Sequence, residues 1–411
     1  MEKPPNDENQ NVKTSTISPR SLVAFWFLGL CNNYGYVVML AGALDILSTH
    51  FHYNGSSYAR ECTQMSTGAI LLADIIPSLT IKFLAPFFPL AIHFRMVLAL
   101  LLSAAGYILV AEAPAVWVAI LGVVCTALSS GLGEASLLSY MAFYKSKNVI
   151  STWSSGTGAA GFFGSFTYAS LTRILGSHET TLYVLLVVPI VMGINFWLIL
   201  EAPKKLQNES DTQDAAKGSY SRSSEMETGD HVPLTNRNLT LTDKIRYIPH
   251  LLIYMIPLFL VYFFEYFINQ GLFELITFDL SWLTHAEQYK WYQVDYQIGV
   301  FLSRSSINLF QIRHTWILAL CQGISLIFFA TEAIFTYVPS IYVIFFAILL
   351  EGFFGGAAYV NTYNRITHEI SDDKREFSMG ITSLADALGI SLAGFLAIPA
   401  HEAICRIPPY K

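Results

Sequence analysis

Charged side chains lie within, or at the edges of, hydrophobic stretches of this chain that are long enough to cross a bilayer. In VYFFEYFINQGLFELI, residues 261–276, Glu265 and Glu274 interrupt a run of aromatic and aliphatic residues. A charge at the centre of a bilayer costs roughly 3 kcal/mol or more, so such groups usually face a polar pathway or a partner. The pattern therefore predicts a polytopic membrane protein with a water-accessible interior, for which transport is the default function.

The composition agrees with insertion into a membrane. Of the 411 residues, 53% are hydrophobic and 13% are charged, whereas about a quarter of the residues in a soluble domain are charged. No basic stripe indicates binding to nucleic acid. The five cysteines lie far apart with no pair at metal-ligand spacing, and we expect neither a metal nor a cofactor.

The hydrophobic stretches predict an all-α fold with about 11 transmembrane helices. A span needs about 20 mostly apolar residues. Six stretches form a predicted bundle within residues 21–200 and five form another within residues 248–405. The expected helices are 22–47, 66–90, 96–111, 116–144, 153–175, 180–200, 248–278, 289–303, 315–335, 340–362 and 377–405. The stretch 289–303 is the weakest prediction, because it is short and contains Gln293, Asp295 and Gln297.

Polar segments flank and separate the two bundles. Residues 1–20 and 406–411 form short tails, and residues 201–247 are rich in Ser, Thr, Asn, Asp, Glu and Lys. The middle segment is too polar to bury a core and is predicted to be a disordered linker. With the N-terminus in the cytosol, most of the 24 Lys and Arg residues also fall on the cytosolic side, as the positive-inside rule requires.

Two bundles joined by a long cytosolic linker are typical of major facilitator transporters. Those folds pair two six-helix halves around a site near the middle of the membrane. Here one terminal helix is missing and the two halves show no convincing sequence repeat. The expectation of such a fold therefore rests on the arrangement of the two bundles and is an analogy with known transporters.

Residues 261–276 contain the strongest candidate site. On a helix, residues four apart share a face, and two amides alternate with the two carboxylates at that spacing. The pairs are Glu265 with Asn269, Gln270 with Glu274, and Tyr262 with Tyr266. One interpretation is a polar substrate wall with a titratable group, and the other is interhelical hydrogen bonding that holds the bundle together. Two carboxylates and two amides exceed what packing needs, which favours substrate binding.

Asp74 and Lys82 are a second polar pair, eight residues apart on one expected helix. At 1.5 Å of rise per residue they are about 12 Å apart along the axis, too far for a direct ion pair. Each therefore needs its own partner or water. Lys82 lies toward the cytosolic end, so an equally simple interpretation is that it reaches out to the membrane surface.

Three further carboxylates, Glu134, Glu351 and Asp386, lie beside glycines. Gly352 and Gly356 follow Glu351 at the small-xxx-small spacing that lets helices approach closely, and residues 156, 160 and 164 repeat that spacing. Such seams are most often packing surfaces. In a transporter they can also slide, so these three carboxylates are candidates for gating or coupling.

Arg304, in the sequence SRSS, is a candidate anion-binding residue together with the neighbouring serines. The guanidinium suits phosphate because its fork donates two parallel hydrogen bonds. The alternative is an anchor on the cytosolic side of the membrane. No HExxH, GxSxG or glycine-rich phosphate loop is present, and we expect no enzymatic activity.

Several motifs resemble those of the battenin family. They include WFLGLCNN at 26–33, LLADIIPSLTIKFLAP at 71–86, STWSSGTG at 151–158, EYFINQGLFEL at 265–275, SRSS at 303–306 and DALGISLAG at 386–394. The similarity extends from about residue 22 to residue 405. Battenin is lost in a childhood neuronal ceroid lipofuscinosis, and this chain resembles a vertebrate orthologue.

This resemblance implies a multi-pass protein of lysosomes and late endosomes, related in fold to major facilitator and equilibrative nucleoside transporters. It implies the export to the cytosol of glycerophosphodiesters, the products of phospholipid breakdown. The matching motifs imply a site among Asp74, Lys82, Glu134, Glu265, Asn269, Arg304, Glu351 and Asp386. Protons are expected to couple to transport through an embedded carboxylate such as Glu265.

Two features depart from the family. Battenin ends in a prenylation box, but here Cys405 is followed by six residues and is not fourth from the end. The acidic dileucine signal is also imperfect, since Leu234 is followed by Thr235. Sorting proteins that bind the cytosolic linker remain expected partners. The alternative function is a non-transporting lysosomal scaffold that regulates trafficking through this linker.

We predict N-glycosylation at Asn54, because the sequon Asn54-Gly55-Ser56 lies in the first lumenal loop. The sequons at Asn208 and Asn238 lie in the cytosolic linker and should stay unmodified. Glycosidase treatment should increase the electrophoretic mobility of the wild-type chain and leave N54Q unchanged. A persistent shift in N54Q that disappears in N208Q would contradict the predicted orientation.

Overall fold

The computed structural model describes residues 18–49, 62, 65–84, 91–141, 144, 147–201, 241–306 and 311–408. Several sequence predictions lie outside these residues. They concern the glycosylation site at Asn54, nearly all of the linker with its sorting motif, and most of both tails. Within the described part of the chain the regular elements are all helical, as predicted.

The N-terminal half contains the elements up to residue 199. They are α1 (Pro19–Ala41), α2 (Ala43–Ser48), α3 (Gly68–Leu84), α4 (Ile92–Ala111), α5 (Val116–Met141), α6 (Lys147–Leu175), α7 (His178–Leu185), α8 (Val187–Ile194) and the π-helical turn η3 (Asn195–Ile199). The last three follow one another closely and together form one span, His178–Ile199.

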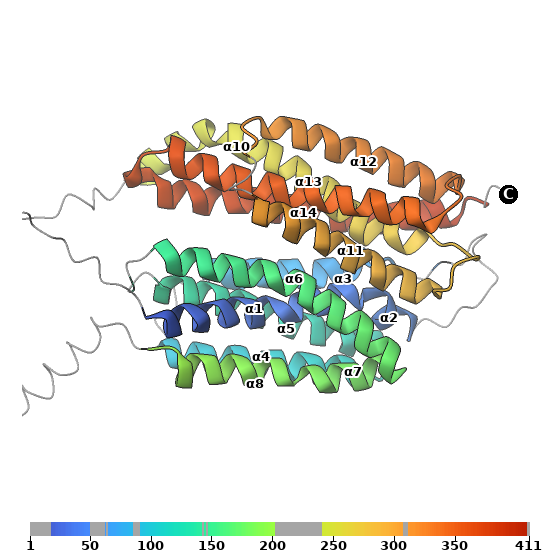
Figure 1. The fold of residues 1–411 in the computed structure, drawn as a ribbon, viewed down its shortest axis with the longest axis horizontal. Helices are drawn as coiled ribbons and strands as arrows, with labels where there is room; N and C mark the ends of the chain where they lie inside the picture. The colour runs from blue at the N-terminus through green and yellow to red at the C-terminus, as the bar shows by residue number, and fades with distance from the viewer. Residues whose placement is uncertain are drawn as a thin grey trace, which may run out of the picture.

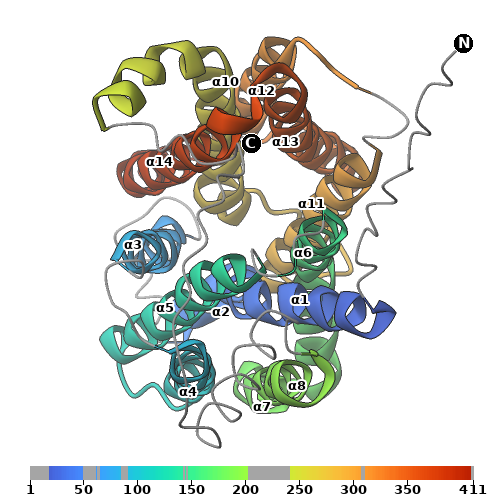
Figure 2. The same cartoon turned by 90° about the vertical axis from the view of Figure 1, so that its left-hand side faces the viewer.

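The C-terminal half contains the remaining elements. They are α10 (Leu241–Phe267), the π-helical η4 (Ile268–Leu272), the 3₁₀ turn η5 (Phe273–Leu275), α11 (His285–Ser305), α12 (Thr315–Phe335), α13 (Ile341–Glu369) and α14 (Asp372–Cys405). Figure 1 shows the two halves as two layers of long helices that run side by side. The halves meet mainly along two seams, α6 against α11 and α3 against α14 (Figure 2).

Within the residues that the structure describes, eight helices are long and apolar enough to cross a membrane. Three further expected spans form α3, α6 and α11, which lie alongside the others in Figure 1 but are shorter or more polar. The weakest prediction, residues 289–303, is a longer helix than expected. It begins at a capping box in which Thr284 and Glu287 satisfy each other's backbone N–H groups. The count of 11 spans stays a prediction.

The predicted span 248–278 is present as Ile245–Leu275. It is not α-helical throughout, because α10 ends at Phe267 and continues as a π-helical turn and then a 3₁₀ turn. The backbone can leave the α-helix here because side chains satisfy its carbonyls. Gln293 donates to the carbonyl of Asn269 at 3.1 Å, and Thr67 donates to that of Gln270 at 2.7 Å. Beyond Phe267 the α-helical spacing is lost. Gln270 and Glu274 therefore do not share an α-helical face.

The glycines singled out in the sequence lie where helix backbones approach closely. A Cβ atom on Gly156 of α6 would lie 2.1 Å from the carbonyl oxygen of Trp26 in α1. A Cβ atom on Gly352 of α13 would lie 2.2 Å from the carbonyl oxygen of Tyr296 in α11. Both distances are shorter than any tolerated contact, so these seams depend on glycine for packing within each half.

We predict that G352A destabilises the protein, because the added methyl group must push α13 away from α11. Gly380 of α14 is the matched control, since a Cβ atom there meets no atom within 4 Å and Ala is favoured over Gly by about 1 kcal/mol in a helix. The apparent melting temperature of detergent-purified protein should fall in G352A and hold or rise in G380A. Equal melting temperatures for the two variants would contradict this assignment.

Candidate functional site

Polar side chains of the two halves meet at three levels along the helices. One level is at the end of the protein where α14 finishes, called here the Cys405 end. Another is at the opposite end, where α1 begins, called here the Pro19 end. The third lies between them. Figure 1 shows these two ends at the right and left of the molecule.

An ion pair joins the halves at the Cys405 end. Lys290 of α11 donates to the carboxylate of Asp45 in α2 at 3.0 Å, and Tyr168 of α6 donates to the same carboxylate at 2.9 Å. Both charged residues are buried, with 6% and 8% of their surface exposed. Next to them, Tyr289 donates to the carbonyl of Leu40 in α1 at 3.0 Å. Removing one partner of a buried ion pair leaves an uncompensated charge, so this junction resists separation.

Glu274 forms a second junction at the same end. Its carboxylate accepts a hydrogen bond from the hydroxyl of Ser66 at 2.8 Å and another from the backbone N–H of Thr67 at 3.1 Å. Both donors precede α3 in the N-terminal half. The sequence placed Glu274 on the same substrate wall as Glu265. The structure instead uses it to hold the two halves together, because the π-helical turn rotates it toward α3.

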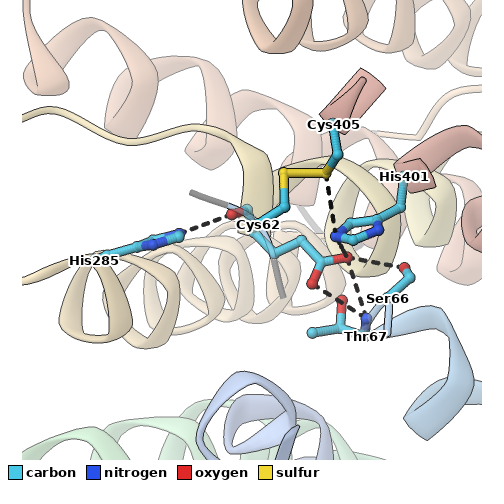
Figure 3. Close-up of a disulfide and its surroundings, with 7 residues drawn as sticks. Cys62, Ser66, Thr67, His285, His401 and Cys405 are labelled. Carbon is cyan, nitrogen blue, oxygen red and sulfur yellow. Dashed lines mark hydrogen bonds and ion pairs between the residues drawn. A yellow bond between two sulfur atoms is a disulfide. The ribbon is translucent and has the colours of Figure 1, made fainter. Parts of the chain in front are cut away.

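A disulfide between Cys62 and Cys405 covers this junction (Figure 3). It connects the segment before α3 to the last residue of α14, so it ties the N-terminal half to the C-terminal half. His401, one turn before Cys405, lies 3.8 Å from the carboxylate of Glu274. The sequence analysis did not pair these cysteines. The available signal was that both lie in predicted non-cytosolic segments, where disulfides persist.

The disulfide also bears on lipid attachment. Cys405 is the residue that the sequence comparison set against the prenylation box of the family. In the structure its sulfur is bonded to Cys62 and is buried. A thioether to an isoprenoid needs a free thiol, so the disulfide and prenylation exclude each other at this residue.

The middle level contains a tyrosine contact between the halves. The hydroxyl of Tyr36 in α1 lies 2.9 Å from that of Tyr266 in α10, and Tyr266 stacks on Tyr262 with ring centroids 6.0 Å apart. Below them, Glu265 accepts a hydrogen bond from Tyr296 of α11. These five groups come from three helices, one in the N-terminal half and two in the C-terminal half, which makes this level sensitive to how the halves are placed.

A small polar cavity lies at this level. Its volume is about 10 Å³, room for about one water molecule. The side-chain oxygen and nitrogen of Asn269, which lines it, have no hydrogen-bond partner within the described part of the protein. Residues of both halves form the wall: Val37, Leu40, Ala41, Ser165, Tyr266, Asn269, Gln270, Gln293, Tyr296 and Gln297. Glutamines 293 and 297 and Tyr296 were not among the predicted site residues.

Charged residues gather where α3, α5, α11 and α14 face one another toward the Pro19 end. Lys82 forms an ion pair with Glu134 at 2.7 Å, with side chains 38% and 28% exposed. Asp386 interacts electrostatically with Lys82, Glu134 and Arg304. The expectation that Lys82 reaches the membrane surface alone is therefore wrong, because α5 supplies a carboxylate that holds it at the seam between halves.

Arg304 lies half-buried between tyrosines. Its guanidinium carbon is 4.5 Å from the ring centroid of Tyr359, a cation–π contact, and one of its nitrogens lies 3.4 Å from the hydroxyl of Tyr262. Its Nε atom has no hydrogen-bond partner among the described residues. The neighbouring hydroxyls do not join it, because Ser303 and Ser306 donate to carbonyls of their own helix. The guanidinium therefore keeps donors available for an anion.

Asp74 and Glu351 are buried more deeply than the others. Asp74 of α3 is fully buried, and neither carboxylate oxygen has a hydrogen-bond partner within the described residues. Its neighbours through electrostatic interaction are Lys82 and Tyr36. Glu351 of α13 accepts a hydrogen bond from Gln322 at 2.7 Å. Both carboxylates lie inside helix bundles, where a carboxylate contributes nothing to packing that an apolar side chain would not.

Comparison with known proteins places the chain in a family. The family model described as "CLN3 protein" matches residues 23–407. Canine battenin is 43% identical over 94% of this chain and 92% of its own length. Protein BTN1 of Yarrowia lipolytica is 36% identical over 95% of this chain and 96% of its own length. The chain belongs to the CLN3 family. The predicted relation to battenin is confirmed at this level, and the vertebrate origin stays a prediction.

Solved structures of transporters share the fold of this CLN3-family chain. An inward-facing, unoccupied bacterial homologue of the human lysosomal transporter Spinster superposes with a TM-score of 0.60 at 14% identity, covering 92% of this chain and 82% of its own. A D-xylose–proton symporter gives 0.58 at 11% identity, covering 95% and 98%. At such identities the likeness concerns the fold alone. The predicted all-α, major facilitator-like architecture is confirmed.

We predict that K290A destabilises the protein strongly, because it leaves the buried carboxylate of Asp45 without its cation. Breaking a buried pair in this way costs about 3–5 kcal/mol. The control is R406A, which breaks the exposed pair of Arg406 with Glu402 and should cost about 0–1 kcal/mol. The apparent melting temperature in detergent measures both. A double variant D45N/K290M should recover part of the loss, and equal stability of K290A and R406A would contradict the role of this junction.

Proposed function

We propose that this chain is a lysosomal membrane transporter that exports glycerophosphodiesters to the cytosol in a proton-coupled reaction. The observation that carries the proposal is Arg304. A cation that lies on the ring of Tyr359 and beside the hydroxyl of Tyr262, with donors still available, is suited to a phosphodiester. A transporter needs such a group at the seam, where both sides of the membrane can reach it in turn.

Other groups suit the rest of the substrate. The amide of Asn269 and the glutamines of the cavity can bind glycerol and headgroup hydroxyls, which donate and accept hydrogen bonds. The stacked rings of Tyr262 and Tyr266 offer faces for a choline group. Lys82 gives a second positive charge close to Asp386, so the substrate anion has two cations at this seam.

The contacts between the halves support a direction of transport, from the lumen to the cytosol. The disulfide and the ion pair of Lys290 both lie at the Cys405 end, and disulfides persist in oxidising, non-cytosolic compartments. Together with the distribution of Lys and Arg, this supports an orientation with the Cys405 end in the lysosomal lumen and the Pro19 end in the cytosol. In this assignment the structure is closed toward the lumen. Uptake from the lumen then requires the junctions of Lys290 and Glu274 to open.

The test is flux of glycerophosphocholine and glycerophosphoinositol into proteoliposomes with an imposed pH gradient. R304A should lower flux at least 10-fold, because a hydrogen bond to a charged group contributes about 1.5–3 kcal/mol. R313A, which removes an exposed arginine at the same end, is the matched control and should keep wild-type flux. E265Q should bind substrate without a response to the gradient.

Two outcomes would contradict the proposal. Flux in R304A equal to that in R313A would remove Arg304 from the site. Absence of flux from folded wild-type protein, with and without the gradient, would favour the scaffold function instead. Replacing the linker in cells would then separate the two functions, because a scaffold depends on its cytosolic segment and a transporter on its helical core.

A further inference from the structure

Four helices of the C-terminal half each direct one polar side chain to the same buried region. α10 contributes Glu265, α11 contributes Tyr296, α12 contributes Gln322 and α13 contributes Glu351. Their exposed fractions are 2%, 5%, 0% and 0%. Polar groups buried to this degree are costly unless they are paired, so their arrangement calls for an explanation.

The two carboxylates lie against the same face of α13. A Cβ atom on Gly355 would lie 2.3–2.6 Å from the carboxylate atoms of Glu265, so this carboxylate rests directly on the α13 backbone. Gly355 follows Glu351 by four residues and therefore lies one turn along the same face. Glu351 also interacts electrostatically with Glu265. Glycine at 355 is what lets the two acidic groups come together.

The hydrogen-bond donors are too few for two ionised carboxylates. Tyr296 donates to one oxygen of Glu265, and Gln322 donates to one oxygen of Glu351 at 2.7 Å. The other oxygen of each carboxylate, and the side-chain oxygen of Gln322, have no partner in the described part of the chain. Buried acceptors without donors require a proton or a cation.

The surrounding charges do not supply that cation directly. Arg304 acts on Glu265 from α11 and Asp386 acts on it from α14, while Asp295 acts on Glu351 from α11. The hydroxyl groups of Tyr266 and Tyr296 complete the set of titratable neighbours. Lys82 acts on Asp386, but neither Glu265 nor Glu351 forms an ion pair among the described residues. Two like charges in such a place cannot both be ionised without a large cost.

We infer that Glu265 and Glu351 form one proton-binding site, in which the two carboxylates share a single proton and Tyr296 and Gln322 orient them. Paired carboxylates hold a proton in this way because one ionised group stabilises the proton on the other. The site lies wholly within the C-terminal half, away from the ion pair of Lys82 with Glu134. It deepens the proposed function by adding Glu351 and two orienting residues to Glu265.

The position of Arg304 connects this site to substrate. Arg304 favours the ionised form of Glu265 through its positive charge. A phosphodiester bound to Arg304 would neutralise that charge, and the carboxylate pair would then bind its proton more tightly. Because coupling between two ligands is reciprocal, the proton would strengthen substrate binding by the same factor. Substrate and proton would therefore bind together and leave together, which is the requirement for symport.

The first test needs no substrate. The folded protein holds a proton that the unfolded chain releases above about pH 5, so stability linked to this site is present at low pH and is lost as pH rises. The apparent melting temperature of the wild type should fall between about pH 5 and pH 8. E265Q and E351Q should each show a smaller fall, because either amide supplies donors to the remaining carboxylate.

Comparing the variants separates one shared proton from two independent ones. If the proton is shared, the melting temperature of the double variant E265Q/E351Q depends on pH no less than that of either single variant. The control is E112Q, because Glu112 is an exposed carboxylate at the end of α4. E112Q should keep the wild-type slope. A wild-type slope in E351Q, or slopes that add in the double variant, would overturn the inference.

If E351Q folds poorly, the variant Y296F provides a second test of the proton site. Y296F removes the donor to Glu265 and should move the fall in melting temperature to higher pH. An unmoved midpoint would count against the pair. In proteoliposomes, E351Q should lose the response to the pH gradient as E265Q does, with substrate exchange retained. If the wild type shows no flux at all, the proposed function fails while the melting experiment still decides whether the proton site exists.

Discussion

The structure of this CLN3-family protein depends on one constraint: a charge carried into a membrane must meet a partner or face water. The charged side chains of the two halves lie where the halves face each other or in the core of each half. Lys82 meets Glu134, Lys290 meets Asp45, and Arg304 lies on Tyr359. The surfaces that point outward are rich in exposed apolar residues instead, such as Leu101, Ile190 and Phe346. The polar interior is therefore a consequence of the same physics that keeps the helices in the bilayer.

The polar contacts are unequal along this interior. At the Cys405 end a disulfide, a buried ion pair and the bonds of Glu274 join the halves. Toward the Pro19 end the charged groups of α3 and α5 pair within their own half, and Arg304 interacts with tyrosines of its own half. Within the described residues, the covalent and ion-pair contacts between the halves are therefore concentrated at the Cys405 end.

The sequence predicted the kinds of residue in the site better than their partners. Glu265, Asn269 and Arg304 were singled out because polar groups in apolar helices are conspicuous. Glu274 was misplaced because a π-helical turn, which no α-helical spacing anticipates, follows Phe267. Gln322 and Tyr296 were missed because a single amide or tyrosine in a helix is unremarkable until its neighbour is known. The pairing of Cys62 with Cys405 was beyond reach because 343 residues separate them.

By itself, the sequence determined that the chain is a helical membrane protein with acidic and amide groups in its interior. Hydrophobic length and charge placement suffice for this, because both act locally along the chain. Only the tertiary structure decided which charges neutralise one another, which end is closed, and that two glutamates from α10 and α13 share one buried region. Those outcomes depend on how helices far apart in the sequence pack, and periodicity within a single helix carries no information about its neighbours.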